Sequence, residues 1–380
     1  MSKPKNIVES LRPRLPDPQL SVARAESTLL RHQLASARLE LGRALDVRGL
    51  LGEAAAAIPA PRPPRPDLRR GRPAVSMLAL WSDVHVGEWI DQAQTDGWGM
   101  FNYAIAEART QRYAERLLRW AATMRGGYRI EEAHLLALGD MISGDIHEEL
   151  SRSNEFPAPI QALLSGRLIA MLASALAGGF RKVRIHAVSG GNHGRLTRKP
   201  QHKQGALNNW DYVAYAYAAA LLRGCPNVVC DLHEAKKVVA DIDGFKFLLG
   251  HGDHVRAWMG LPYYGLARDL GREAERRLSR IMDQIRADER IDGGMDYGLG
   301  GHFHAPFTGP SGRYLINGSL SGTTELDHDV GRHAAPQQVS ALLHKRHGLF
   351  GVTYWRLDDP TDVGLIGVRR GEELIGKGLE

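Results

Sequence analysis

Short runs of β-branched and aliphatic residues alternate with longer amphipathic stretches over most of the chain. Short runs bounded by polar clusters are typical of strands, and apolar positions three and four residues apart are typical of helices. Their alternation predicts an α/β fold. The predicted strands are Val75 to Trp81, His134 to Leu138, Val183 to Val188, Lys246 to Leu249, Tyr297 to Leu299, Tyr314 to Asn317 and Gly351 to Arg356, and the predicted helices are Tyr103 to Met124, Pro159 to Leu176, Leu207 to Leu222 and Tyr263 to Ala287.

Three segments of the chain differ in composition. Residues 1–58 begin with a proline-bearing arm and continue, from about Gln19 to Ile58, with a predicted N-terminal helix. The apolar stripe of this helix, which includes Leu30 and Leu34, must pack against the main domain, a second helix or the same helix of another subunit, and the last case predicts a homo-oligomer. Residues 59–75 are rich in proline and arginine, which predicts a semi-rigid linker that either contacts phosphate groups or is a solvated tether. Residues 76–380 form the main domain.

Composition narrows the class of protein without identifying it. A hydrophobic content of 43% is sufficient for a sizeable core. Two cysteines, Cys225 and Cys230, cannot build a disulfide framework, which favours a reducing, cytoplasmic location. The first residues lack the apolar core of a signal peptide, and the longest apolar run, Leu168 to Ala177, is too short to cross a bilayer, so we expect no membrane contact. The formal charge of +6 favours polyanionic partners but decides little alone.

Residue types that bind metals follow five of the predicted strands. They are SDVH at 82–85, GD at 139–140, GNH at 191–193, GH at 250–251 and GHFH at 301–304. Strand ends are where α/β folds place active sites, and the glycine in or beside most of these groups lets the backbone turn sharply. The donors are carboxylates, one carboxamide and several imidazoles. Such a mixed set favours Mn, Fe or Zn over Ca or Mg, whose sites are rich in oxygen.

The order D-x-H, G-D, G-N-H, G-H and G-H-x-H resembles the five motifs of the calcineurin-like metallophosphoesterases over roughly residues 76 to 325. The resemblance implies a sandwich of two mixed β-sheets flanked by helices, with two metal ions at the loop edge, most readily Mn and alternatively Fe or Zn. It implies that the carboxylate of Asp140 bridges the two ions. The implied ligands are Asp83, His85, Asp140 and His304 for the first metal and Asp140, Asn192, His251 and His302 for the second.

The implied reaction is hydrolysis of a phosphate ester by a hydroxide that bridges the two metals. In the family scheme His193 follows a ligand without being one, so its ring can face the leaving group, and we expect it to be the general acid. The family often has Glu or Asp after G-N-H, whereas this chain has Gly194 and Arg195. This departure concerns substrate contacts, and Arg195 either binds a phosphate oxygen or is solvated.

The substrate class rests on weaker signals. The segment Tyr314 to Asp327 contains an Asn-Gly-Ser turn that resembles the one in nuclease-like members of the family. Arg256 and Tyr264 belong to a stretch in which aromatic residues alternate with cations, which is typical of nucleic-acid binding, although a helix packed on the sheet would explain it equally. His254 either supports the ligands or is an ordinary loop histidine. We therefore expect substrate contacts at Arg195, His254, Arg256 and Tyr264.

Three functions are compatible with these signals. The leading one is a phosphodiesterase that acts on nucleic acid. The alternatives are a phosphatase or phosphodiesterase for a small phosphorylated metabolite, and a scaffolding protein that retains the metal site.

Overall fold

The computed structural model describes Val22 and residues 26–38, 71–257, 262–286, 295–309 and 311–366. The chain divides into two compact units, Met1–Arg70 and Gly71–Glu380. In the first unit, residues 26–38 form a helix whose side chains are all exposed, with Leu30 and Leu34 among them. The remainder of the expected helix, and the linker as far as residue 70, lie outside the described residues. The homo-oligomer contact therefore stays a prediction.

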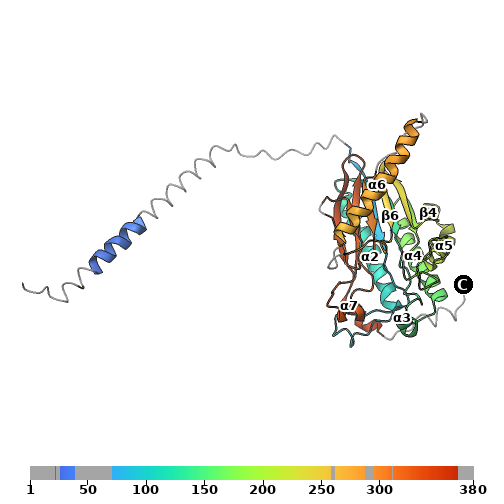
Figure 1. Ribbon diagram of the computed structural model, residues 1–380, viewed down its shortest axis with the longest axis horizontal. Coiled ribbons are helices and arrows are strands. Elements are labelled where there is room, and N and C mark those ends of the chain that lie inside the picture. Colours follow the sequence, from blue (N-terminus) through green and yellow to red (C-terminus); the bar gives the residue numbers. More distant parts are fainter. Residues whose placement is uncertain are drawn as a thin grey trace, which may run out of the picture. The chain divides into compact units, whose positions relative to one another are not determined.

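The first of two mixed sheets in the second unit has six strands (Figure 1). Across the sheet these are β11 (Gly348–Arg356), β10 (Gln337–His344), β1 (Ala74–Trp81), β2 (Arg129–Ala137), β3 (Lys182–Val188) and β4 (Val228–His233). From β1 to β4 neighbouring strands are parallel, whereas β10 pairs antiparallel with β1 and β11 with β10.

The second sheet has five strands. Across it these are β5 (Lys237–Ile242), β6 (Phe245–Gly250), β7 (Tyr297–Gly300), β9 (Tyr314–Ile316) and β8 (Phe307–Thr308). β6, β7 and β9 are parallel, and the strands at the two edges are antiparallel to their neighbours. Helices flank this pair of sheets, so the predicted two-sheet α/β fold is confirmed.

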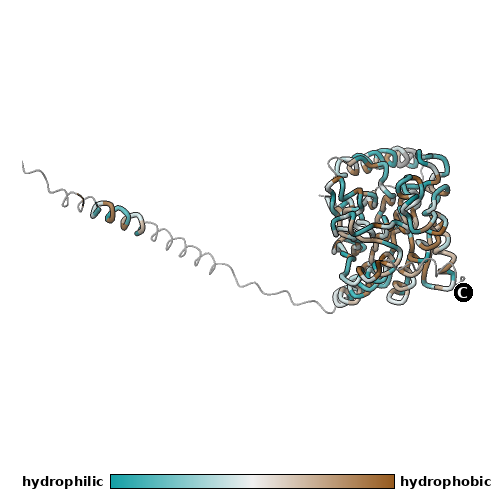
Figure 2. The backbone as a smooth tube through the Cα atoms, turned by 90° about the horizontal axis from the view of Figure 1, so that it is seen from below, coloured by the Kyte–Doolittle hydropathy of each residue, from teal (hydrophilic) through white to brown (hydrophobic). Residues whose placement is uncertain are grey.

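Both faces of β1 are buried, and alternate residues face different layers. Met77, Ala79 and Trp81 belong to the apolar cluster between the first sheet and its helices, whereas Leu78 and Leu80 belong to the cluster between the two sheets. This alternation follows from the two-residue period of a strand. Apolar segments accordingly gather inside the body of the domain (Figure 2).

Three long helices, α2 (Tyr103–Met124), α4 (Ala158–Gly179) and α5 (Trp210–Leu221), contribute to the cluster outside the first sheet. By length and composition α4 could cross a membrane, although 61% of its most apolar window is buried in the protein. Its contacts with α2, α5 and β3 account for that apolar surface, as in the core helix of a domain.

Several boundaries differ from the sequence prediction. The helix predicted from Leu207 begins at Trp210, because the side chain of Asn209 caps it by accepting from the backbone N–H of Asp211. β1 begins at Ala74, inside the expected linker. Four strands, β4, β5, β8 and β10, were not predicted. β10 contains the buried polar residue Gln338, which interrupts its apolar pattern.

Candidate metal centre

All five motifs lie at one edge of the fold. Asp83 follows β1, Asp140 follows β2, Asn192 follows β3, His251 follows β6, and His302 and His304 follow β7. The short helices α3 (Glu148–Ser153) and α7 (Glu325–Asp329), which come after the second and last motifs, lie at the same end of the domain (Figure 1). Parallel strands of both sheets therefore deliver their motifs to a common place.

The backbone at this edge is in an unusual conformation. Left-handed backbone costs a non-glycine residue about 1–2 kcal/mol and is concentrated at functional sites. Five of the predicted ligands adopt it, with φ between 51° and 75°: Asp83, His85, Asp140, His302 and His304. The surrounding structure holds these residues in place despite that cost.

One group of donor atoms comes from Asp83, His85 and His304, which each offer an atom within 4.8 Å of the others. The Nε2 atoms of His85 and His304 are 3.1 Å apart. The Nε2 atom of His304 is 3.8 Å from Oδ1 of Asp83. These three side chains therefore converge as ligands of a single ion would.

Asp140 belongs to two further groups of donor atoms. Asp140 lies within 4.8 Å of His251 and His302 in one cluster and of His85 and His193 in another. Its Oδ2 atom is 2.9 Å from Nε2 of His251, which is itself 3.2 Å from Oδ1 of Asn192. The structure thus brings all seven predicted ligands together, and their role as ligands stays a prediction.

Polar partners at the outer nitrogen orient three of the imidazoles, two through hydrogen bonds and one through a carboxylate at ion-pair distance. Nδ1 of His251 lies 2.9 Å from the carbonyl oxygen of Leu138, and Nδ1 of His193 lies 2.8 Å from that of Ser143. A carbonyl only accepts, so each Nδ1 carries the proton and each Nε2 is left for the centre. In His304 the Nδ1 atom faces the carboxylate of Asp327 at 3.9 Å. Partners of this kind fix the tautomer of metal-binding histidines.

The electrostatics of the centre call for a cation. Burial would raise the pKa of Asp140, but His251 and His193 hold it well below its ordinary value, so the carboxylate is ionised. Burial would lower the pKa of His251, but Asp140 raises it to about 10. Burial lowers the pKa of His85 well below its usual value, and its buried Nδ1 has no hydrogen-bond partner among the described residues. A divalent cation would neutralise the ionised carboxylate of Asp140 and give the imidazole nitrogens a partner, so the donor set fits a metal.

Asp211 supports the centre and was not found from the sequence. Its side chain is fully buried, and its two oxygens accept from the backbone N–H groups of Met141 and Gly191, each at 2.9 Å. These two residues adjoin Asp140 and Asn192. The carboxylate of Asp211 therefore joins the loops that carry a ligand from each of two strands.

We expect Asp211→Asn to lower metal affinity by about 10- to 100-fold, as loss of an outer-shell partner typically does. The amide has only one oxygen, so its NH2 group must face one of the two backbone N–H donors, and the loops move apart. Calorimetric titration with Mn²⁺ would measure the change. Asp231→Asn, at the edge strand β4, is the control, and equal affinities in the two variants would contradict this role.

The Asn-Gly-Ser turn also supports the predicted ligands. The side chain of Asn317 donates to the hydroxyl of Ser82, which in turn donates to the carboxylate of Asp83. The backbone N–H of Ser319 donates to the carbonyl of His304, and that of Leu320 to the carbonyl of Asp83. The turn thus lies behind the first group of ligands.

The expected substrate contacts are in different surroundings. Arg195 is half-buried, and its Nε–H donates to the carbonyl of Asn192 at 3.0 Å. His254 lies 3.0 Å from the carboxylate of Asp269, on the helix α6 (Tyr263–Arg286), and is engaged there. Arg256 is exposed, and Tyr264 is 72% exposed. Only Arg195 is tied directly to a predicted ligand.

The chain is similar in structure to several solved proteins, at low sequence identity. No protein-family model and no curated protein matches the chain. Among solved structures, a single-mutant Vps29 from Entamoeba histolytica is 15% identical over 74% of this chain and 99% of its own, with a TM-score of 0.25. A predicted phosphoesterase from Streptococcus pneumoniae TIGR4 is 12% identical over 74% and 98%, with a TM-score of 0.28. A dimetal phosphatase from Danio rerio is 12% identical over 75% and 100%, with a TM-score of 0.32.

Sequence identities and TM-scores this low carry no argument, so the interpretation of the metal centre rests on the residues of this chain and their arrangement. The chain has a two-sheet α/β fold and, at one edge of it, the motif order of the calcineurin-like metallophosphoesterases.

Proposed function

We propose that this protein is a dinuclear-metal phosphoesterase that hydrolyses phosphodiester bonds of nucleic acid. The observation that carries the proposal is the position of Asp140, whose carboxylate groups with His251 and His302 on one side and, on the other, with His85, which also belongs to the group of Asp83 and His304. A shared carboxylate is what two cations at the ~3.5 to 4 Å spacing of dinuclear sites require. In this proposal Asp83, His85 and His304 complete one site, and Asn192, His251 and His302 complete the other.

Two ions bound there would activate water near neutral pH and offset the charge on the phosphoryl oxygens, and Mn is the metal we expect, with Fe or Zn as alternatives. The protein itself orients the groups around them. Arg195, held at the Asn192 carbonyl, would use its remaining N–H groups to bind a phosphoryl oxygen.

His193 is the proposed proton donor to the leaving oxygen. Its Nδ1–H donates to Ser143, so its Nε2 is the atom that can deliver a proton. Burial lowers the pKa of His193, although Asp140 partly opposes this. A bound phosphodiester anion adds negative charge beside the ring and favours the protonated form that a general acid needs.

The exposed start of α6 supports nucleic acid as the substrate. Tyr263 and Tyr264 are exposed, and their rings meet edge to face at 5.3 Å. Arg256 and Arg268 are exposed on either side of them in the sequence. Aromatic faces for bases beside cations for phosphates are the usual elements of single-strand binding. Trp258, an aromatic residue of the same stretch of sequence, lies outside the described residues.

An assay on five substrates tests the proposal. Purified protein reconstituted with Mn would be incubated with single-stranded DNA, double-stranded DNA, RNA, a bis-aryl phosphate and a mono-aryl phosphate. We expect hydrolysis of the bis-aryl diester and of at least one nucleic acid, and loss of both with EDTA. Hydrolysis restricted to monoesters or small molecules would favour the metabolite phosphatase. A fully metallated protein without any hydrolysis would favour the scaffolding protein.

A further inference from the structure

The loop that follows the third motif carries an unbalanced positive charge. Between Asn192 and Trp210 the sequence has no Asp or Glu, and it has two arginines and two lysines. We refer to residues 195–205 as the basic loop. Its cations are Arg195, Arg198, Lys199 and Lys203, of which the last three are exposed, and none of the four forms an ion pair with a described residue.

The residues that flank the basic loop are fixed to one another beside the predicted ligand Asn192. At its start, Gly194 accepts from the backbone N–H of Trp210, and Arg195 forms a β-bridge with Asn209. The side chain of Asn209 also donates to the carbonyl of Gly191 at 2.9 Å. The loop therefore leaves the centre and returns to it, and its cations stay near the ligands.

The geometry limits how far the cations reach. Arg198 follows Arg195 by three residues, which spans at most about 10 Å of extended chain. Neighbouring phosphates along one strand of a duplex rise by about 3.4 Å per nucleotide. The exposed cations can thus meet phosphates within a few nucleotides of the one at the centre.

Lys236 adds a further cation at the base of the loop. Its aliphatic chain passes so close to Gly190 and Gly205 that a Cβ atom on either glycine would lie 2.8 Å or 2.6 Å from it. The absence of side chains at both positions leaves room for this lysine. A lysine held between the two stems places its charge beside the loop independently of the loop's own sequence.

The charge of Arg198 is not neutralised across the neighbouring hollow. Arg198, His147, Glu148 and Glu149 line a hollow of about 440 Å³. Glu148 is paired with Arg152 of the same helix. No ion pair joins Arg198 to the exposed Glu149 in the part of the chain that the structure describes, so the cation is available to an anionic ligand.

We propose that the basic loop and Lys236 bind the phosphate backbone of a nucleic-acid strand, on one side of the phosphodiester held at the metal centre. This inference rests on the proposed function. The basic loop would contact phosphates beyond the scissile one, so it would strengthen binding of a polymer but not of a small phosphodiester. Phosphate contacts of this kind position the strand without reading its sequence.

The test compares two variants with the same loss of charge. One is Arg198→Gln/Lys199→Gln/Lys203→Gln in the loop. The control is Arg119→Gln/Arg181→Gln/Lys345→Gln, whose residues are exposed and pair with Glu115, Glu131 and the half-buried Asp243. Binding of a hydrolysis-resistant phosphorothioate oligonucleotide would be followed by fluorescence anisotropy as KCl is raised, and kcat/KM would be measured for an oligonucleotide and for a bis-aryl phosphate.

We expect the loop variant to bind the oligonucleotide at least about 10-fold more weakly at low salt, and its salt slope to fall by about 2, since each single-strand contact contributes about 0.7. Its kcat/KM for the bis-aryl phosphate should equal that of the control. Identical anisotropy and salt slopes in the two variants would overturn the inference, while hydrolysis of the bis-aryl phosphate by both would leave the phosphoesterase proposal standing.

Two further results are distinguishable. A parallel loss of metal content and of both activities in the loop variant would make the loop a structural support of the centre and overturn its binding role. Salt-dependent oligonucleotide binding that needs the loop, in a protein that hydrolyses neither substrate, would retain the surface and reject the hydrolase.

Discussion

Asp140→Asn is expected to leave the protein folded and unable to hold two metal ions. The amide keeps an oxygen that can accept from the backbone N–H of His193, as Oδ1 of Asp140 does at 2.9 Å. Its NH2 group can donate to Nε2 of His251, because Nδ1 of that ring carries the proton. The variant therefore satisfies the buried hydrogen bonds while losing the anionic charge that two cations would share.

The metal ions supply several kcal/mol of charge stabilisation in the transition state. Each 1.36 kcal/mol lost slows the reaction tenfold, so we expect activity to fall by at least about 10³-fold. Elemental analysis should find at least one ion fewer per chain. Thermal unfolding provides a second readout, because a metal at 100 times its dissociation constant stabilises the native state by about 2.7 kcal/mol. That increment should disappear in the variant.

Asp241→Asn is the matched control, since this exposed residue of β5 pairs with Lys246 and accepts from the backbone N–H of Gly244, away from the predicted ligands. It should retain metal, activity and the metal-dependent rise in melting temperature. Full activity of Asp140→Asn with two ions per chain would mean that the centre is elsewhere.

Local patterns explain what the sequence could predict. The helix Tyr103–Met124 has the predicted bounds, and both of its ends carry local signals, since Asn102 caps its first turn and two glycines follow closely after its last. The ligand motifs were found because each is a short polar group immediately after an apolar run. These features involve residues that are close in sequence.

The supports of the centre depend on pairs that are far apart in sequence. Asp211 accepts from Met141, which is 70 residues away in the sequence. From the local sequence alone, an Asp in the first turn of α5 looks like an ordinary helix-capping residue. Asp327 similarly reads as the partner of Thr324 in a capping box, which it also is. Only the folded chain brings its oxygens towards His304.

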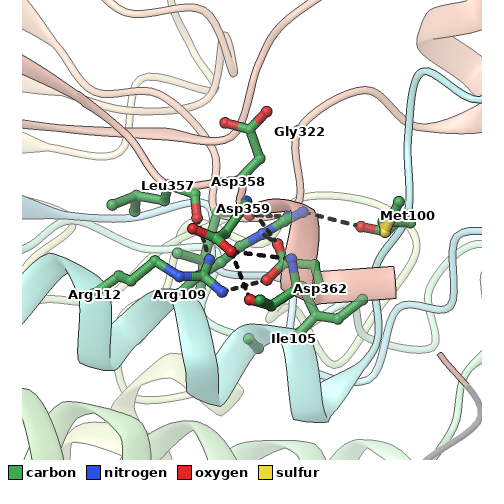
Figure 3. A network of polar contacts seen from close by, with 12 residues as sticks. Met100, Ile105, Arg109, Arg112, Gly322, Leu357, Asp358, Asp359 and Asp362 are labelled. Atoms are coloured by element: carbon green, nitrogen blue, oxygen red, sulfur yellow. Dashed lines mark hydrogen bonds and ion pairs between the residues drawn. The ribbon is translucent and has the colours of Figure 1, made fainter. Parts of the chain in front are cut away.

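A buried ion-pair network shows the same limitation (Figure 3). Arg109 of α2 pairs with Asp362 of the 3-10 helix η3 (Pro360–Leu365), 253 residues away, at 3.2 Å. It also donates to the carbonyls of Leu320 and Ser321, each at 2.8 Å. Burial lowers the pKa of Arg109 to about 10, so it remains charged near neutral pH. The network fixes the C-terminal segment to the residues that follow the Asn-Gly-Ser turn.

His193→Ala is expected to separate substrates by their leaving groups. A sugar hydroxyl leaves as a poorly stabilised alkoxide and needs a proton in the transition state, whereas a nitrophenolate with a pKa near ~7 does not. The variant should lose about 10²- to 10⁴-fold in kcat on an oligonucleotide and retain most of its kcat on a nitrophenyl phosphodiester. Metal content should be unchanged, because Asp140 and the other ligands remain.

The pH dependence of the rate tests whether His193 acts as an acid. A general acid works only while protonated, so the wild-type rate on the oligonucleotide should fall as pH rises through the pKa of His193 in the substrate complex, and the variant should lack that decline. His347→Ala, in the turn between β10 and β11, controls for removal of an imidazole elsewhere. If His193 were instead a ligand or a packing residue, its replacement would lower metal occupancy or melting temperature and slow both substrates alike. Rates on the two substrates and metal content, measured on one preparation, therefore decide whether the ring that Ser143 orients delivers the proton.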